Sequence, residues 1–183
     1  MDKYEKKVRI DQIESLMRQG EFAEAVSIAD SIDWRTEKKI RTLRMVSEVY
    51  KINKRYEDAF QVLMIAYDKN PDDPIKKKIV YDLCELTIKM RETAYAVKFF
   101  KEYVMLSPRD PGRYILQYKL YKEQEVAIDE RIAVLEEFKE KYYADFREKW
   151  AYELAYLYHT SGQEGKCVDE CDELILWFVK GPY

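Results

Sequence analysis

The chain has 183 residues, the size of one ordinary domain or one short array of repeats. Only 5 glycines and 5 prolines accompany 37% charged and 47% apolar residues, a composition that predicts helices with short loops and excludes a wholly disordered chain. The net charge is −3, with 20 Lys/Arg against 18 Asp/Glu in residues 1–100 and 12 against 17 in residues 101–183. Neither balance is typical of a dedicated nucleic-acid-binding protein, so we expect no nucleic-acid partner.

The N-terminus, the apolar runs and the cysteines indicate where the protein works. Residues 1–14 lack the apolar segment of a secretory signal. The longest apolar run, Leu174–Val179, has six residues and is too short to span a bilayer. Three cysteines, an odd number, suit a reducing compartment. We therefore expect a cytoplasmic protein that does not enter the membrane.

Apolar residues recur at three- and four-residue spacing along most of the chain, which predicts about ten helices. No segment alternates apolar and polar residues, so we expect no strands. Thr36 and Asp129 are the expected N-caps of the third and eighth helices, and Pro74 is expected in the first turn of the fifth. The helices are expected at about 4–19, 21–32, 36–52, 56–70, 75–89, 92–106 and 113–122, then from about 129, over 146–160, and after 162 to about 179.

Residues 54–74, KRYEDAFQVLMIAYDKNPDDP, show the pattern most clearly. Tyr56, Ala59 and Ala66 lie on one face of the expected helix, and the two alanines allow a neighbouring helix to approach closely. Asn70 precedes Pro71, and a residue before proline disfavours helical geometry, so the helix should stop there. The stretch therefore resembles the second half of a helical hairpin.

Similar hairpins recur along the chain at a nearly constant spacing. Ala25 and Ala59 are 34 residues apart, as are Phe22 and Tyr56. The prolines at 71 and 108 are 37 residues apart, with Ala96 in the role of Ala59. A period of this length indicates an array of helical repeats.

The array resembles tetratricopeptide repeats, including those of bacterial proteins. In unit four, Lys119 and Arg131 replace small residues of the pattern, and unit one has a weak first helix. HEAT-type helix pairs are an alternative, but their periods are longer. The pattern is matched in unit two by Leu43, Ser47, Tyr50, Tyr56, Ala59, Ala66 and Pro71, and in unit five by Trp150, Leu154, Ala155, Tyr158, Gly162 and Cys167.

The resemblance implies an all-α, right-handed α-solenoid of about five antiparallel helix pairs in a single domain over residues 1–183. Stacked pairs would share a continuous core, because one hairpin is too small to bury its own apolar face. The first helix of each pair, here called the A helix, would line a concave groove. The second is called the B helix. The repeats are expected at about 4–34, 36–71, 74–108, 111–143 and 146–179.

The residues that carry enzyme chemistry are scarce. His159 is the only histidine, so a triad or a metal pair would rest on one residue. Cys167 and Cys171 stand one helical turn apart but lack further ligands, and with Cys84 they are interpreted as small packing residues. No phosphate-binding glycine loop or nucleophile motif occurs. We expect no enzyme, no cofactor and no metal.

The family's groove is then the expected binding site, for a protein or an extended peptide with acidic groups or a free carboxylate. Arginine binds carboxylates with two hydrogen bonds, and tyrosine supplies contact area at low entropic cost. Exposed Lys, Arg and Tyr also occur simply as solvated surface. The Lys/Asn carboxylate clamp of the family is missing, so a chaperone tail is not the expected ligand. The candidate residues are Arg41, Arg44, Glu48, Lys51, Lys78, Tyr81, Asp82, Glu85, Lys89, Arg113, Gln117, Lys149, Tyr152, Tyr156 and His159.

The last helix is apolar all round at its end, where a terminal repeat normally has a polar outer face. Leu174, Trp177 and Phe178 are therefore expected to pack against further helices or a second copy, unless the run packs internally. The ending at residues 181–183 is abrupt, which favours a fragment of a longer protein. The sequence thus predicts a non-enzymatic interaction scaffold. The alternative is a sensor segment of a larger regulator, and an enzyme that uses His159 is a minor third.

Overall fold

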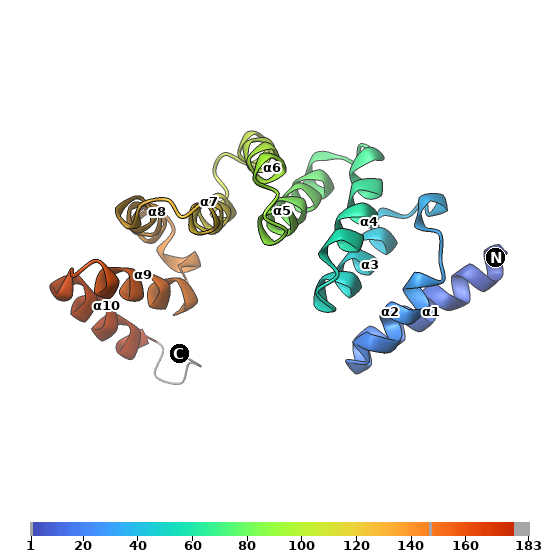
Figure 1. The fold of residues 1–183 in the computed structure, drawn as a ribbon, viewed down its shortest axis with the longest axis horizontal. Helices are drawn as coiled ribbons and strands as arrows, with labels where there is room; N and C mark the ends of the chain where they lie inside the picture. The colour runs from blue at the N-terminus through green and yellow to red at the C-terminus, as the bar shows by residue number, and fades with distance from the viewer. Residues whose placement is uncertain (1, 147, 178–183) are drawn as a thin grey trace. The chain divides into compact units, whose positions relative to one another are not determined.

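The structure, a computed structural model, describes residues 2–146 and 148–177, and it is helical throughout these ranges (Figure 1). Ten α-helices and two short 3₁₀ turns, η1 and η2, are present in this part of the chain, and no strand is. The all-helical prediction is therefore confirmed. The elements are α1 (Lys3–Gln19), α2 (Phe22–Asp30), η1 (Trp34–Thr36), α3 (Ile40–Ile52), α4 (Tyr56–Asp68), α5 (Asp73–Lys89), α6 (Thr93–Leu106), α7 (Gly112–Glu123), α8 (Ile128–Lys141), η2 (Tyr143–Asp145), α9 (Glu148–Thr160) and α10 (Glu164–Trp177).

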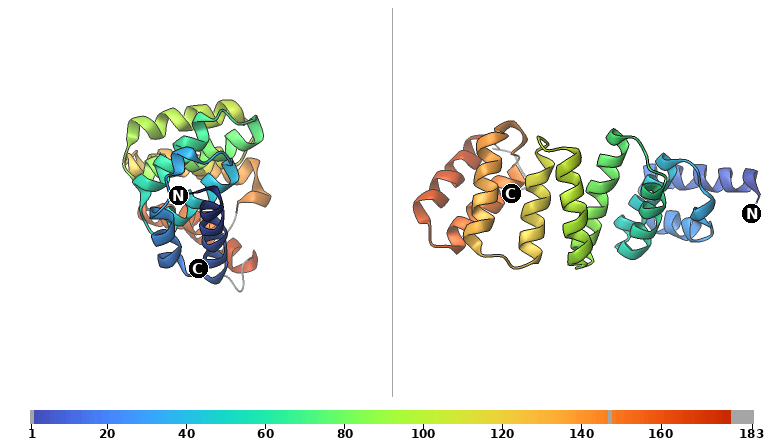
Figure 2. Two further views of the ribbon diagram at one scale, coloured as in Figure 1. Left: turned by 90° about the vertical axis from the view of Figure 1, so that its right-hand side faces the viewer. Right: turned by 90° about the horizontal axis from the view of Figure 1, so that it is seen from above.

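The chain divides into two compact units, residues 1–107 and residues 108–183. Unit 1 contains three helix pairs, α1–α2, α3–α4 and α5–α6, and unit 2 contains two, α7–α8 and α9–α10. Within unit 1, α4, α5 and α6 pack side by side, as Figure 2 shows from above. The division falls between Ser107 and Pro108, within the proline- and glycine-containing segment that precedes α7. A single superhelical domain over residues 1–183 stays a prediction.

Two expected helix starts are wrong. Thr36 ends the 3₁₀ turn η1 and does not cap α3, which begins at Ile40. The reason is Glu37, whose carboxylate accepts the backbone N–H groups of Lys38 and Lys39 at 3.0 and 2.8 Å and so holds the chain out of the helix. Asp129 lies inside the first turn of α8, which begins one residue earlier. Pro74 lies in the first turn of α5, as predicted.

In all five helix pairs, the same kind of turn joins the A helix to the B helix. In each turn one residue adopts the left-handed conformation, and the N–H of the next residue donates to the carbonyl five positions earlier, as in a Schellman motif. The left-handed residues are Gly20, Lys54, Arg91, Glu125 and Gly162, with φ of 81, 60, 61, 53 and 76°. The five bonds are Glu21→Leu16, Arg55→Tyr50, Glu92→Thr87, Val126→Tyr121 and Gln163→Tyr158, at 2.9–3.0 Å. Unit four of the repeat pattern, the poorest sequence match, thus has the same turn as the others.

Small residues of unit 1 are buried where its helices contact each other. Ala25, Ala59 and Ala96 are fully buried, as the repeat pattern predicts. Ser47 of α3 donates its hydroxyl to the carbonyl of Ala59 on α4, 3.0 Å away. Cys84 of α5 makes the equivalent contact to the carbonyl of Ala96 on α6, at 3.6 Å. These contacts confirm that Cys84 is a packing residue.

Unit 2 has an aromatic core. The ring of Phe138 on α8 stacks on Tyr114 of α7, with centroids 5.7 Å apart, and meets Phe146 edge-on at 5.3 Å. Trp150 of α9 meets Tyr118 of α7 edge-on at 6.0 Å. Cys167 packs against this core. Cys171 is exposed, however, so its interpretation as a packing residue is wrong.

Candidate functional site

Unit 1 presents an A-helix face, defined here by the outward residues of α3 and α5. Arg41, Arg44 and Glu48 project from α3, and Asp82 projects from α5. These four predicted residues come together around a hollow of about 370 Å³, which Ile40, Met45 and Ile75 also line. A second hollow of about 150 Å³ is lined by Arg44, Lys77, Lys78, Tyr81, Asp82 and Tyr103.

An ion pair forms the wall that the two hollows share. Nη2 of Arg44 donates to Oδ2 of Asp82 at 3.2 Å, and about a third of each side chain is exposed. Burial raises the pKa of the Asp82 carboxyl, while Arg44 and then Lys51 oppose this effect. Nε of Arg44 is buried and has no hydrogen-bond partner among the described residues. A ligand can therefore reach the guanidinium only through the exposed third of the side chain.

Lysines extend the positive charge of this face. Lys51 lies 2.6 Å from Glu48, and although burial alone would lower the pKa of Lys51, Glu48 together with Asp82 and Glu85 raises it. Lys51 is therefore charged at neutral pH. Lys78 is exposed at the second hollow. Lys89 lies apart from both hollows, with its ammonium 5.3 Å from the ring centre of Tyr56 on α4.

The remaining candidates belong to unit 2. Arg113 donates to the carbonyl of Pro108 at 3.2 Å and to the hydroxyl of Tyr114 at 3.1 Å, and Gln117 donates to the hydroxyl of Tyr121 at 3.3 Å. Both residues thus already donate hydrogen bonds to neighbours within unit 2. The other four, Lys149, Tyr152, Tyr156 and His159, form an exposed stripe along α9. Tyr152 and Tyr156 are 48% and 57% exposed.

Several residues around the hollows were not among the sequence candidates. Ile40 and Met45 have the spacing of core residues, and Tyr103 comes from a B helix. Ile75 and Glu14 could have been predicted from helical spacing in the sequence. Ile75 falls on the helical stripe of Lys78 and Asp82. Glu14 of α1, which lies 3.5 Å from Arg41, falls on the corresponding outward stripe of the first A helix.

No group of three or more His, Cys, Asp or Glu side chains in the described ranges is placed to hold a metal ion. Among these residues no helix is long and apolar enough to cross a membrane. His159 is exposed on α9 and Cys167 and Cys171 lie on α10. Of the expected contacts of the last helix, Leu174 and Trp177 are described, whereas Phe178 lies outside the described residues.

Comparison with known proteins gives a fold and no close relative. No protein-family model matches the chain, and no curated protein matches it in sequence. Solved structures do match. A tetratricopeptide repeat protein from Parabacteroides merdae ATCC 43184 superposes with a TM-score of 0.75 at 16% identity, over 93% of this chain. This chain spans 64% of the length of that structure.

Two further solved structures match over nearly their whole length. MamA, residues 41 to the end, from Desulfovibrio magneticus RS-1 has a TM-score of 0.72 at 13% identity, with 97% of each chain covered. The tetratricopeptide-like repeats of a kinesin light chain from Podosopora anserina score 0.66 at 15% identity, with 92% of each chain covered. At these identities the likeness is one of fold. The chain has a tetratricopeptide-repeat-like helical fold.

Proposed function

We propose that the protein is a non-enzymatic scaffold that holds a partner polypeptide on the A-helix face of unit 1. The observation that carries this proposal is the pair of adjoining hollows whose shared wall contains Arg44, a partly exposed arginine. Arginine favours carboxylates because its planar donors match both oxygens. The proposed ligand is accordingly an extended peptide with an acidic side chain or a free C-terminal carboxylate.

The hollows support a peptide ligand more than a cofactor. Their volumes, about 370 and 150 Å³, lie at or below the lower end for sites that enclose a drug-sized molecule, about 300–1,000 Å³. Two adjoining hollows can instead receive successive side chains of one extended chain. Ile40, Met45 and Ile75 supply apolar contact on one side of the ion pair, and Tyr81 and Tyr103 supply aromatic contact on the other.

Binding of labelled peptides, followed by fluorescence anisotropy, tests the proposal. A panel with free C-terminal carboxylates is compared with the same panel amidated. Arg44→Gln should weaken binding of the best carboxylate peptide about tenfold or more, because a hydrogen bond to a charged group is lost. The matched control is Lys69→Gln, which removes one charge from an exposed residue at the end of α4. Equal affinity of the two variants would place the binding site elsewhere.

A second candidate function, self-association, is favoured by the end of α10. Ile175 and Leu176 are 69% and 74% exposed there and stand next to each other. A second copy of the chain, packing against this helix as a further repeat would, is the proposed occupant. Light scattering should then show a dimer that Leu176→Lys dissociates and Met105→Lys, equally exposed on α6, does not. A monomeric wild-type protein would rule this out.

The free thiols of Cys167 and Cys171 bear on the proposed location of the scaffold. The two cysteines lie one turn apart on α10 and are not joined in a disulfide. Unpaired thiols persist in reducing compartments. We therefore place the protein in the cytoplasm as part of this proposal.

A further inference from the structure

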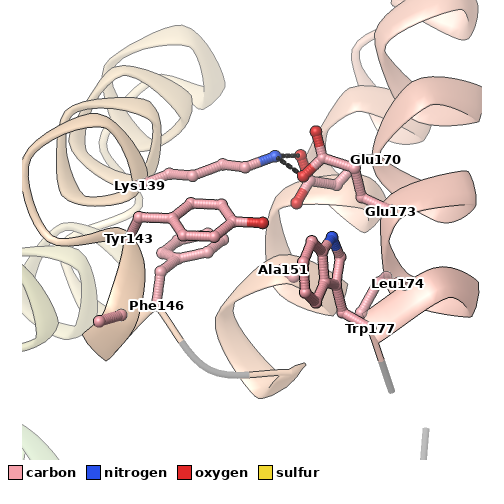
Figure 3. A pocket seen from close by; sticks show the side chains of 9 residues that line it. Lys139, Tyr143, Phe146, Ala151, Glu170, Glu173, Leu174 and Trp177 are labelled. Atoms are coloured by element: carbon pink, nitrogen blue, oxygen red, sulfur yellow. Dashed lines mark hydrogen bonds and ion pairs between the residues drawn. The ribbon is translucent and has the colours of Figure 1, made fainter. Parts of the chain in front are cut away.

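Unit 2 contains a pocket of about 200 Å³ on the side of its B helices. Lys139 of α8 and Tyr143 of η2 form one wall, and Glu170, Glu173 and Trp177 of α10 form the other (Figure 3). Phe146, Ala144, Leu174 and Ala151 complete the lining. None of these residues belongs to the A-helix face of unit 1, so the pocket is independent of the peptide site proposed there.

Glu170 is the unusual residue of this pocket. Its side chain is only 5% exposed, and Oε2 accepts a hydrogen bond from Nζ of Lys139 at 2.7 Å. Oε1 is buried and has no partner among the described residues. A buried carboxylate oxygen normally has a donor, because leaving it unsatisfied costs free energy, and more so when the group is charged. Burial raises the pKa of the Glu170 carboxyl, and Lys139 opposes this effect.

The charge around Glu170 favours a cationic occupant. Lys139 is shared, because its Nζ also lies 2.6 Å from Oε2 of Glu173. One ammonium thus faces two carboxylates, which leaves the pocket one negative charge in excess. An adjacent hollow that includes Lys139 and Glu170 adds two further carboxylates, those of Glu136 and Glu140, and Lys166 lies 2.7 Å from Glu136.

The aromatic side chains define the shape of that occupant. In Figure 3, the rings of Tyr143 and Trp177 lie beside the bridge from Lys139 to the two carboxylates. Tyr143 is 54% exposed and Trp177 is 67% exposed, so a ligand can reach both rings from solvent. Aromatic faces attract cations, and guanidinium groups stack on them particularly well. A volume of about 200 Å³ admits one long side chain and is smaller than the sites that enclose drug-sized ligands.

We propose that this pocket binds an arginine side chain of a partner polypeptide. The guanidinium donates to Oε1 of Glu170 and stacks on Trp177, while its aliphatic stem packs against Phe146 and Leu174. Arginine fits better than lysine, because its several donors satisfy Oε1 while Lys139 retains Oε2, and because its planar group matches the indole ring.

The test is a titration of the 183-residue chain with Nα-acetyl-arginine amide, followed by NMR of the indole N–H groups. The chain has three tryptophans, so the signal of Trp177 can be assigned by substitution. A saturable shift of this signal is expected, and the neutral isostere Nα-acetyl-citrulline amide should cause none. Absence of a saturable shift with the arginine compound, or an equal shift with citrulline, would overturn the proposal.

Variants locate the interaction at Glu170. Glu170→Gln should weaken arginine binding about tenfold or more, whereas Asp172→Asn, an equal loss of charge at an exposed position of α10, should change it less than twofold. Tyr143→Ala, at an exposed position that does not endanger folding, should also weaken binding and leaves Trp177 as the reporter. Unchanged affinity in both Glu170→Gln and Tyr143→Ala would overturn the assignment.

A further arm separates a polypeptide side chain from a small-molecule ligand. Free arginine carries an α-ammonium and a carboxylate that a residue within a polypeptide lacks. The blocked compound should bind at least as tightly as free arginine if the pocket accepts a side chain. Much tighter binding of free arginine would identify a metabolite site and overturn the assignment to a partner polypeptide.

Discussion

Ala59 lies where α4 meets α3, and its side chain is fully buried against that helix. A larger side chain there would push the two helices apart and break the bond from Ser47 to the carbonyl of Ala59. Ala59→Leu should therefore lower the free energy of unfolding by about 1–3 kcal/mol, the usual cost of overpacking. Urea unfolding followed by circular dichroism measures this. Ala23→Leu, at an exposed position of α2, is the control and should change it by less than about 0.5 kcal/mol.

Tyr50 makes stability depend on pH in the alkaline range. Burial, with the Asp30 carboxylate that its hydroxyl meets at 3.1 Å, raises the pKa of Tyr50 to about 12. This folded pKa lies above the unfolded value of about 10, so the contribution is complete below about pH 10 and is lost as the pH rises through 12. Tyr50→Phe should lower stability by about 1–3 kcal/mol near neutral pH, because the hydrogen bond to a charged group is removed.

Thermal melting at a series of alkaline pH values checks the second part of this prediction. The Tyr50→Phe variant should lose less stability between pH 10 and pH 12 than the wild-type protein does. Tyr95→Phe is the matched control, since it removes the same hydroxyl from a tyrosine that is 49% exposed. Parallel pH profiles for wild type and Tyr50→Phe would show that Tyr50 does not contribute to the alkaline loss.

The same three-part contact recurs in unit 2 at Tyr158. Its hydroxyl donates to Glu136 at 2.8 Å, and Lys166 lies 2.7 Å from the same carboxylate, as Arg55 lies 2.6 Å from Asp30 in unit 1. In both units a tyrosine of an A helix joins a carboxylate on the preceding B helix to a cation near the start of the following B helix. These links help to fix the spacing of successive helices. The repeat pattern predicts Tyr50 and Tyr158 but not their charged partners.

At the scale of the elements, the closing turns carry a clear prediction. Gly162 has φ of 76° in the turn before α10, whereas Gly165 lies within α10, and neither has an atom within 4 Å of an added Cβ. The two positions therefore differ in backbone conformation alone. Gly162→Ala should cost about 1–2 kcal/mol, because an L residue is strained in the left-handed region. Gly165→Ala should instead stabilise by up to about 1 kcal/mol, because alanine favours the helix.

Thermal unfolding of the two alanine variants, followed by circular dichroism, gives the comparison. Both positions lie in unit 2, so one transition reports on both changes. The variants should shift the melting temperature in opposite directions. Shifts of the same sign and size would mean that the left-handed conformation at Gly162 is not what stabilises the turn.

The elements were largely predictable from the sequence, and the site was not. Ten helices follow from spacing, and buried alanines such as Ala59 follow from the period, because both are local or repeated signals. The start of α3 does not follow, since the carboxylate of Glu37 competes with the helix for backbone N–H groups. The pairing of Arg44 with Asp82 joins residues 38 positions apart and depends on how α3 and α5 are rotated. The buried oxygen of Glu170 had no sequence signal at all.

For the whole molecule, the division at Ser107–Pro108 predicts two unfolding events in place of one. Trp34 reports on unit 1, and Trp150 and Trp177 report on unit 2. Trp34→Phe retains only the tryptophans of unit 2, and the double variant Trp150→Phe, Trp177→Phe retains only that of unit 1. Urea unfolding followed by tryptophan fluorescence should give different midpoints for these two variants. Repeat arrays lose cooperativity in this way when the coupling between parts is weak.

Adding Ala59→Leu to each fluorescence variant sharpens the test of the two units. The midpoint reported by Trp34 should fall, while the midpoint reported by the unit 2 tryptophans should stay within error. Coincident curves that Ala59→Leu shifts equally would show that residues 1–177 unfold as one cooperative body.

The five turns that join the helices of each pair have a consequence for recognising such repeats in a sequence. A glycine is the residue by which this turn is recognised in a sequence. Lys54, Arg91 and Glu125 nevertheless adopt the same left-handed backbone conformation. A search of the sequence for glycine therefore finds two of these turns, whereas the backbone dihedral angles identify all five. The lack of a glycine at this place in a sequence therefore does not exclude a helix pair, because Lys, Arg and Glu adopt the required backbone conformation in three of the five turns.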